Sequence, residues 1–179
     1  KTLPNVAEQT ASSIQGRVEE RLNALEDIAE IHEINNVNNS WENKKSVLLD
    51  EVKTTGSTSM GIADKSGICQ YADGSTKNIS SRAFFKKALS GVSNVSDPII
   101  SKIDGKLIVV YAVPIKNNND IVGVLLETKD GNNLTDLVSK LKVGTTGSAF
   151  MIAKDGTTIA NADKSLVLKM YNVFNAVKK

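Results

Sequence analysis

The sequence is poor in the residues that catalysis and metal binding most often use. It contains one cysteine, Cys69, and one histidine, His32, among 179 residues. A single cysteine excludes an internal disulfide and a cysteine-rich metal site, and a single histidine removes the usual partners of a catalytic nucleophile or a zinc ion. The sequence also lacks a Gly-x-Ser-x-Gly motif. We therefore expect no cofactor, no metal and no enzymatic activity, and we interpret both residues as structural.

Long apolar runs and blocks of one charge are also missing. No window approaches the roughly 18 consecutive apolar residues of a membrane span, and no signal-peptide pattern opens the sequence. The 22 Lys and Arg residues nearly balance the 20 Asp and Glu residues, which gives a formal net charge of +2. Because these charges are spread along the chain, they indicate neither a nucleic-acid partner nor an acidic membrane surface.

The first part of the chain has helical periodicity. From Asn5 to about Asn36, apolar residues recur at spacings of three and four, which predicts an amphipathic helix. A helix of roughly 30 residues would run about 45 Å, more than one compact domain needs. We expect the extra length to pair with a second copy of the chain. After an asparagine-rich loop at 35–40, the segment from Trp41 to Lys53 predicts a second helix.

After Gly56 the apolar pattern changes to the alternation typical of strands. Two strands, a helical crossover and three more antiparallel strands form the plan of a PAS-like α+β sensor fold with a five-stranded antiparallel sheet. The predicted elements are a hairpin of 59–64 and 68–71, a short helix over 80–89 with Ser81 as its N-cap, and strands at 95–101, 107–115 and 121–129.

The last part of the sequence begins the same plan again. A helix is predicted over 133–141, followed by strands at 149–153 and 157–160. The sequence ends before a second sheet can close, so we expect the natural protein to continue. The resulting division is residues 1–55 for the two N-terminal helices, 56–130 for the first PAS-like module, and 131–179 for a linker helix with an incomplete second module.

Several short motifs follow one another in a specific order. They are Arg-x-Phe-Phe at 82–85, Ser-Asp-Pro at 96–98, Ala-Val-Pro-Ile at 112–115, Val-Gly-Val at 122–124, Asp-Gly-Asn-Asn-Leu at 130–134 and Gly-Thr-Thr-Gly-Ser-Ala-Phe at 144–150. Together they resemble the double Cache sensory domains of bacterial methyl-accepting chemotaxis receptors of the clostridial type. Such domains also occur on histidine kinases and diguanylate cyclases.

The resemblance implies an extracellular domain of a receptor in the cell membrane, held between two flanking spans that this sequence does not include. It implies that the membrane-distal module, 56–130, binds a small molecule such as an amino acid, and that the module beginning near Val143 lies closer to the membrane. It also implies a homodimer through the long first helix in the full receptor. A sensor domain of a histidine kinase or diguanylate cyclase, and a domain that docks a solute-binding protein, are the related alternatives.

The amino-acid-binding branch of this family holds the ligand carboxylate with an Arg-x-Trp-Tyr motif and the ligand ammonium with aspartates. A desolvated zwitterion needs such a bidentate cation at one end and a carboxylate at the other. By this resemblance, Arg82 is the carboxylate anchor and Asp97 an acidic anchor. Phe84 and Phe85 stand where the motif has Trp and Tyr, and Thr128 stands near the position of a second acidic residue.

Two tyrosines are further candidates because they fall in strands of the predicted sheet. Tyr71 and Tyr111 could each direct a hydroxyl at the ligand, whereas Lys77 stands where that branch often has another tyrosine. Other roles are open for the two anchors: Arg82 could cap its helix or form a salt bridge, and Asp97 could make an Asx turn before proline.

Two functions of other classes also stay open. An enzyme could use aspartates as acid, base or metal ligands, but the candidates stand at turn positions, where aspartate is common: Asp64, Asp73, Asp97 and Asp155. A purely structural spacer that sets the geometry of a receptor dimer would tolerate alanine at both Arg82 and Asp97.

Overall fold

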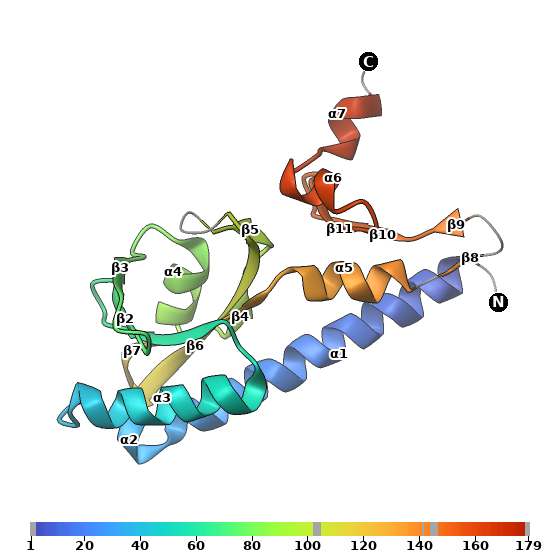
Figure 1. The fold of residues 1–179 in the computed structure, drawn as a ribbon. Coiled ribbons are helices and arrows are strands. Elements are labelled where there is room, and N and C mark those ends of the chain that lie inside the picture. The colour runs from blue at the N-terminus through green and yellow to red at the C-terminus, as the bar shows by residue number, and fades with distance from the viewer. Residues whose placement is uncertain (1–2, 102–104, 141, 144–146, 178–179) are drawn as a thin grey trace. The chain divides into compact units, whose positions relative to one another are not determined.

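The computed structural model describes residues 3–101, 105–140, 142–143 and 147–177. The chain divides into two compact units, of which the first comprises Lys1–Ser96 and Val110–Lys129 and the second comprises Asp97–Val109 and Asp130–Lys179. Figure 1 shows the elements of both units coloured along the chain. None of the helices in the described ranges is both long and apolar enough to cross a bilayer.

Three helices open the first unit. Helix α1 spans Leu3–Glu30, α2 spans His32–Asn35 and α3 spans Trp41–Thr55. The long helix is therefore confirmed, but it ends earlier than predicted because Ile31 leaves the helical conformation, with φ −58° and ψ 133°. Asparagine amides satisfy two carbonyls near this break: Asn35 Nδ2 donates to Glu30 O at 3.0 Å and Asn39 Nδ2 donates to Glu33 O at 2.8 Å.

The strand pattern builds one mixed-length sheet in the order β3-β2-β1-β7-β6-β4, with β5 paired to β6. The predicted plan is confirmed, with a short polar strand added at one edge. The third predicted strand, at 95–101, divides into two pieces around Pro98, because proline cannot donate a backbone hydrogen bond to a ladder. The bounds are β1 Ser59–Ala63, β2 Ile68–Tyr71, β3 Thr76–Asn78, β4 Asn94–Val95, β5 Ile99–Ile100, β6 Leu107–Asn117 and β7 Asp120–Asp130.

Helix α4 spans Ala83–Leu89 and begins later than predicted. The prediction of Ser81 as its N-cap is wrong, because Arg82 occupies that position and no side chain caps the helix. An Asx turn holds the preceding residues out of the helix: Asn78 Oδ1 accepts hydrogen bonds from Ser80 N at 3.0 Å and from Ser80 Oγ at 2.7 Å. In Figure 1, α4 lies on the side of the sheet away from α1 and α3.

The core of the first unit lies between the sheet and its N-terminal helices. We call this side of the sheet the helix face. Trp41 from α3 and Tyr111 from β6 pack against it while staying partly exposed. Because buried apolar area stabilises by about 25 cal/mol per Å², this cluster fixes α1 on the sheet. Its buried members are Leu25, Ile28, Ala29, Ile34, Leu48, Met60, Ala72, Val113, Ile115 and Leu125.

The second unit contains the helix and hairpin that the sequence predicts. Strands β10 and β11 pair antiparallel, and the turn between them places Gly156 at φ 87°. Asp155 Oδ1 accepts a hydrogen bond from Thr157 N at 2.9 Å in this turn. The elements are α5 Asn132–Ser139, β8 Lys142–Val143, β9 Gly147–Ser148, β10 Phe150–Ile152, β11 Thr158–Asn161, α6 Lys164–Leu168 and α7 Val173–Val177. The predicted end of the helix at Leu141 lies outside the described residues.

Candidate functional site

The side of the sheet opposite the helix face forms the candidate face. Gly61 in β1 pairs with Tyr71 in β2 and with Leu126 in β7. Paired residues direct their side chains to the same side of a sheet, and successive residues alternate. Leu125 belongs to the helix-face core, so Leu126 and Thr128 point to the candidate face. Helix α4 covers this face with Phe85, which is 2% exposed.

A glycine makes room for the tyrosine on the candidate face. A Cβ atom at Gly61 would lie 2.9 Å from Tyr71 Cδ1, 2.9 Å from Cys69 Sγ and 2.8 Å from the backbone oxygen of Gln70. The Gln70 oxygen belongs to the paired strand and cannot move away freely. The Tyr71 ring therefore lies directly against the backbone of β1, which explains why this strand position needs glycine.

Alanine at Gly61 is expected to lower the free energy of unfolding by about 1–3 kcal/mol, because the added methyl group overpacks a buried site. The matched control is Gly16→Ala in α1, where an added Cβ meets nothing within 4 Å. That change is expected to stabilise the helix by about 0.5–1 kcal/mol. Urea unfolding of both variants measures the two effects, and shifts of the same sign would contradict this packing.

The ring of Tyr71 lies against a lysine. Lys77 Nζ is 4.6 Å from the centroid of the Tyr71 ring. Burial raises the pKa of the Tyr71 hydroxyl, Cys69 adds to this effect, and the charge of Arg82 acts in the opposite direction. The guanidinium of Arg82 is thus near enough to influence the ionisation of Tyr71. Burial also raises the pKa of Cys69 to about 12, so its thiol is an inert apolar group at neutral pH.

The side chain of Arg82, at the start of α4, is exposed. Its side chain does not cap the helix, and it forms no salt bridge within the described part of the chain. The two alternative roles that the sequence left open for this arginine are therefore not seen. An exposed guanidinium beside a buried tyrosine is able to pair with a carboxylate from outside the chain.

The two phenylalanines have different surroundings, as adjacent helical residues must. Phe85 is buried against the candidate face, whereas Phe84 is half-buried. Asn94, a buried residue that sequence reasoning missed, donates from Nδ2 to Phe84 O at 3.1 Å and to Val92 O at 3.0 Å. It ties α4 to the start of β4. In the sequence, a lone asparagine at the start of a strand resembles a loop residue, so no sequence pattern predicts that Asn94 is buried.

The structure separates the remaining predicted residues. Thr128 is buried on the candidate face and pairs with Ser59. Tyr111 packs against the helix-face core instead, where burial and the nearby Glu127 raise the pKa of its hydroxyl. Tyr111 therefore cannot share a site with Tyr71, because the sheet lies between them. Asp97 is an exposed residue of the second unit, and its part in binding stays a prediction from the sequence.

Three of the four aspartates considered as catalytic candidates accept hydrogen bonds from the backbone of their own turns. Asp64 accepts from Ser66 N at 2.8 Å, Asp73 accepts from Ser75 N at 2.8 Å, and Asp155 makes the equivalent bond to Thr157. Hydrogen bonds within these turns lower the pKa of all three carboxyls. No cluster of three or more His, Cys, Asp or Glu residues that could hold a metal occurs in the residues described.

The antiparallel sheet has α1, α2 and α3 on one face and the short helix α4 on the other. This arrangement defines a PAS-like α+β domain. Residues 2–178 match the Cache domain family, and the chain belongs to this family. The predicted likeness to Cache domains is thereby confirmed for nearly the whole chain, and the clostridial type stays a prediction.

Solved ligand-binding domains of chemoreceptors share this fold. The domain of Pseudomonas fluorescens CtaA, in complex with L-serine, matches with a TM-score of 0.78 and 24% identity, covering 96% of this chain and 75% of that one. Pseudomonas aeruginosa PctC, in complex with GABA, matches at TM-score 0.79 and 22% identity over 99% of this chain and 81% of that one. Campylobacter jejuni Tlp3, with isoleucine bound, matches at TM-score 0.71 and 18% identity over 97% and 75% of the two chains.

One curated relative is a whole receptor. The methyl-accepting chemotaxis protein PscA of Pseudomonas syringae pv. tomato is 28% identical over 92 residues, which is 51% of this chain and 15% of that protein. The matched segment is therefore a small part of that receptor.

Proposed function

We propose that this Cache domain is the extracytoplasmic sensor of a transmembrane chemotaxis receptor and binds an amino acid or similar small polar metabolite on the candidate face. The observation that carries the proposal is Arg82, an exposed guanidinium at the start of α4 that has no salt-bridge partner among the described residues. The ligands in the solved complexes of similar fold, L-serine, GABA and isoleucine, each have a carboxylate and an ammonium group.

A carboxylate ligand fits the charges of the candidate face. Lys77 Nζ lies 4.6 Å from the centroid of the Tyr71 ring, and the charge of Arg82 also acts on the Tyr71 hydroxyl. An arginine fork donates two parallel hydrogen bonds to the two oxygens of a carboxylate. Thr128 supplies a hydroxyl on the same face, from strand β7, which pairs with β1. The apolar surface of Phe84 is left partly accessible for the body of the ligand.

The receptor assignment extends to the whole protein. In it, membrane spans flank the domain, the first unit lies away from the membrane, and α1 pairs with α1 of a second copy. Ile14 and Val18 support the pairing, since both apolar side chains on α1 are left partly exposed. Ligand binding can bias signalling only through a difference in affinity between two receptor states.

Isothermal titration calorimetry of the chain against the standard amino acids and related small polar metabolites tests this proposal. We expect saturable one-site binding of at least one ligand that carries a carboxylate. Binding only in the presence of a solute-binding protein would favour the docking alternative and count against direct sensing. An absence of binding heat for every compound, from a chain shown to be folded by circular dichroism, would contradict the proposal.

A further inference from the structure

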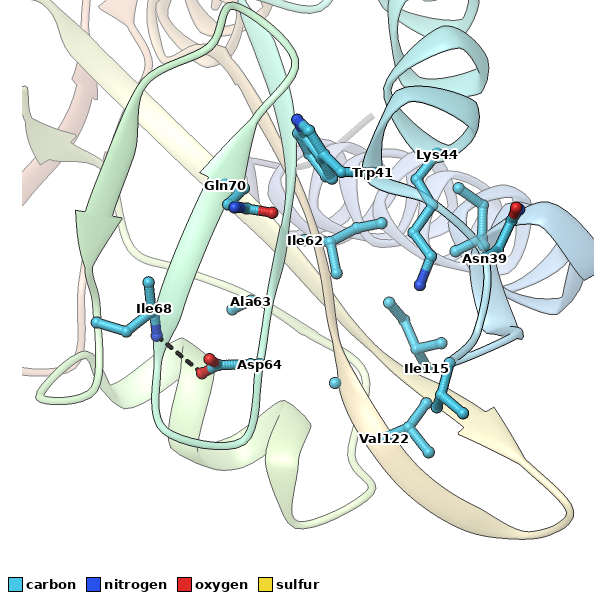
Figure 2. Close-up of a pocket in the computed structure, with 13 residues that line it drawn as sticks. Asn39, Trp41, Lys44, Ile62, Ala63, Asp64, Ile68, Gln70, Ile115 and Val122 are labelled. Atoms are coloured by element: carbon cyan, nitrogen blue, oxygen red, sulfur yellow. Dashed lines mark hydrogen bonds between the residues drawn. The ribbon is translucent and has the colours of Figure 1, made fainter.

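A pocket opens on the helix face of the first unit, between the sheet and the segment that joins α2 to α3. Its volume is about 380 Å³, which falls in the usual range of about 300–1,000 Å³ for small-molecule sites. Figure 2 shows its walls, formed by Trp41 of α3, Ile62 of β1, Ile115 of β6 and Val122 of β7. We call it the helix-face pocket.

The helix-face pocket is separate from the candidate face. Ile62 pairs with Gln70, and both line the pocket. The next residues along the two strands, Gly61 and Tyr71, face the opposite side of the sheet, where the Tyr71 side chain lies. A molecule in one place would therefore have the full thickness of the sheet between itself and a molecule in the other.

The pocket contains one cation that lacks a counter-ion. Figure 2 shows the side chain of Lys44 extending from α3 into the hollow, with its ammonium directed toward Ile115. Lys44 is half-buried and forms no salt bridge with any residue that the structure describes. Burial lowers the pKa of its ammonium, because leaving water disfavours the charged form when no anion compensates.

The carboxylate in the lining does not serve as that counter-ion. Asp64 lies on the far side of the hollow and is held by its own turn. Its Oδ1 accepts hydrogen bonds from Ser66 N at 2.8 Å, Ser66 Oγ at 2.6 Å and Ile68 N at 3.1 Å. Asn39 is similarly engaged, since its amide donates to Glu33 O and its oxygen accepts from Asn43. Lys44 is thus left as the charged group able to meet a charged guest, and the amide of Gln70, which also lines the pocket (Figure 2), adds a neutral polar group.

We propose that the helix-face pocket binds a small monocarboxylate with an apolar body, whose carboxylate pairs with Lys44 and whose body packs on Trp41, Ile62 and Ile115. One unpaired cation matches one negative charge, which favours a monocarboxylate over a doubly charged phosphate. Apolar side chains with a small number of polar groups are the usual composition of a small-molecule site. This second site does not depend on ligand binding at the candidate face.

Trp41 allows a direct test, because it is the single tryptophan of the chain and lines the pocket. Hexanoate is the probe, and hexanamide is its neutral counterpart of nearly the same shape. We expect hexanoate to change the tryptophan fluorescence of the intact chain in a saturable way, and to bind about tenfold more tightly than hexanamide, since hydrogen bonds to charged groups are worth about 1.5–3 kcal/mol.

Two variants sharpen the result. Lys44→Met is expected to weaken hexanoate binding about tenfold while leaving hexanamide binding unchanged. Its matched control, Lys45→Met, changes the neighbouring lysine, which does not line the pocket, and is expected to keep wild-type affinity. Equal affinities for hexanoate and hexanamide on the unmodified chain, or no saturable fluorescence change, would overturn the proposal even if Lys44→Met failed to fold.

Discussion

Replacing Arg21 by methionine is expected to lower the free energy of unfolding by about 3–5 kcal/mol, because it leaves a buried carboxylate without its partner. Glu127 is completely buried, and its oxygens accept hydrogen bonds from Arg21 Nε at 2.6 Å and Arg21 Nη2 at 2.8 Å. Ser57 also donates to Glu127, and Lys129 Nζ lies 3.5 Å from Oε1. Without the arginine, these weaker partners cannot compensate the buried charge.

Urea unfolding measures this effect against a matched arginine on the same helix. Arg17 lies one turn earlier in α1 and is exposed, so Arg17→Met is expected to change stability by less than about 0.5 kcal/mol. Replacing both Arg21 and Glu127 by methionine should recover much of the loss, since an apolar pair leaves no buried charge. Equal stability of the Arg21 and Arg17 variants would show that the ion pair does not hold α1 to the sheet.

The same ion pair has a consequence for signalling. Strand β7 directs Glu127 toward α1 and the adjacent Thr128 toward the candidate face. In the proposed sensor, a ligand that contacts Thr128 and the long helix that contacts Glu127 would therefore meet neighbouring residues of one strand. A bidentate pair between buried groups is a rigid link, which suits the transfer of the small helix shifts, about 1–2 Å, typical of such interfaces.

Alanine at Arg82 is expected to weaken binding of the tightest amino acid by about 100-fold, because truncating one partner of a hydrogen-bonded charge pair costs about 2–5 kcal/mol. Lysine at the same position keeps the charge but loses the planar fork. We expect Arg82→Lys to retain intermediate affinity, about tenfold below wild type. Calorimetry with the same ligand and buffer gives all three affinities.

Arg17→Ala is the control for this series, since it removes an exposed arginine from α1 at a position that does not face the sheet core. It is expected to bind as wild type does. Because Arg82 makes no internal salt bridge in the described residues, its removal should leave the unfolding midpoint unchanged. Wild-type affinity in Arg82→Ala would remove Arg82 from the binding site.

Much of the fold was predictable because its periodicities are strong. The long amphipathic stripe and the alternation after Gly56 predict α1 and the main strands. The differences arise where side chains compete locally with the backbone. Asparagine amides satisfy carbonyls at the break after Glu30, and the Asn78 turn delays α4. The edge strand β3 was missed because its Thr-Lys-Asn sequence has no apolar alternation.

The candidate site was predictable only in part. Arg82 followed from motif resemblance and Tyr71 from strand position, and the charge of Arg82 acts on the pKa of the Tyr71 hydroxyl. The partnership of Arg21 with Glu127 joins residues 106 positions apart, and no local pattern reports such pairs. The helix-face pocket was missed for a similar reason, since helical spacing marks Trp41 as a core residue but cannot show that a hollow remains beside it.

The most direct measurement is a crystal structure of the chain with the amino acid that calorimetry finds to bind most tightly. The proposed function predicts a ligand on the candidate face, with both carboxylate oxygens about 2.7–2.9 Å from nitrogens of the Arg82 guanidinium. A ligand bound elsewhere, with Arg82 directed into solvent, would contradict it.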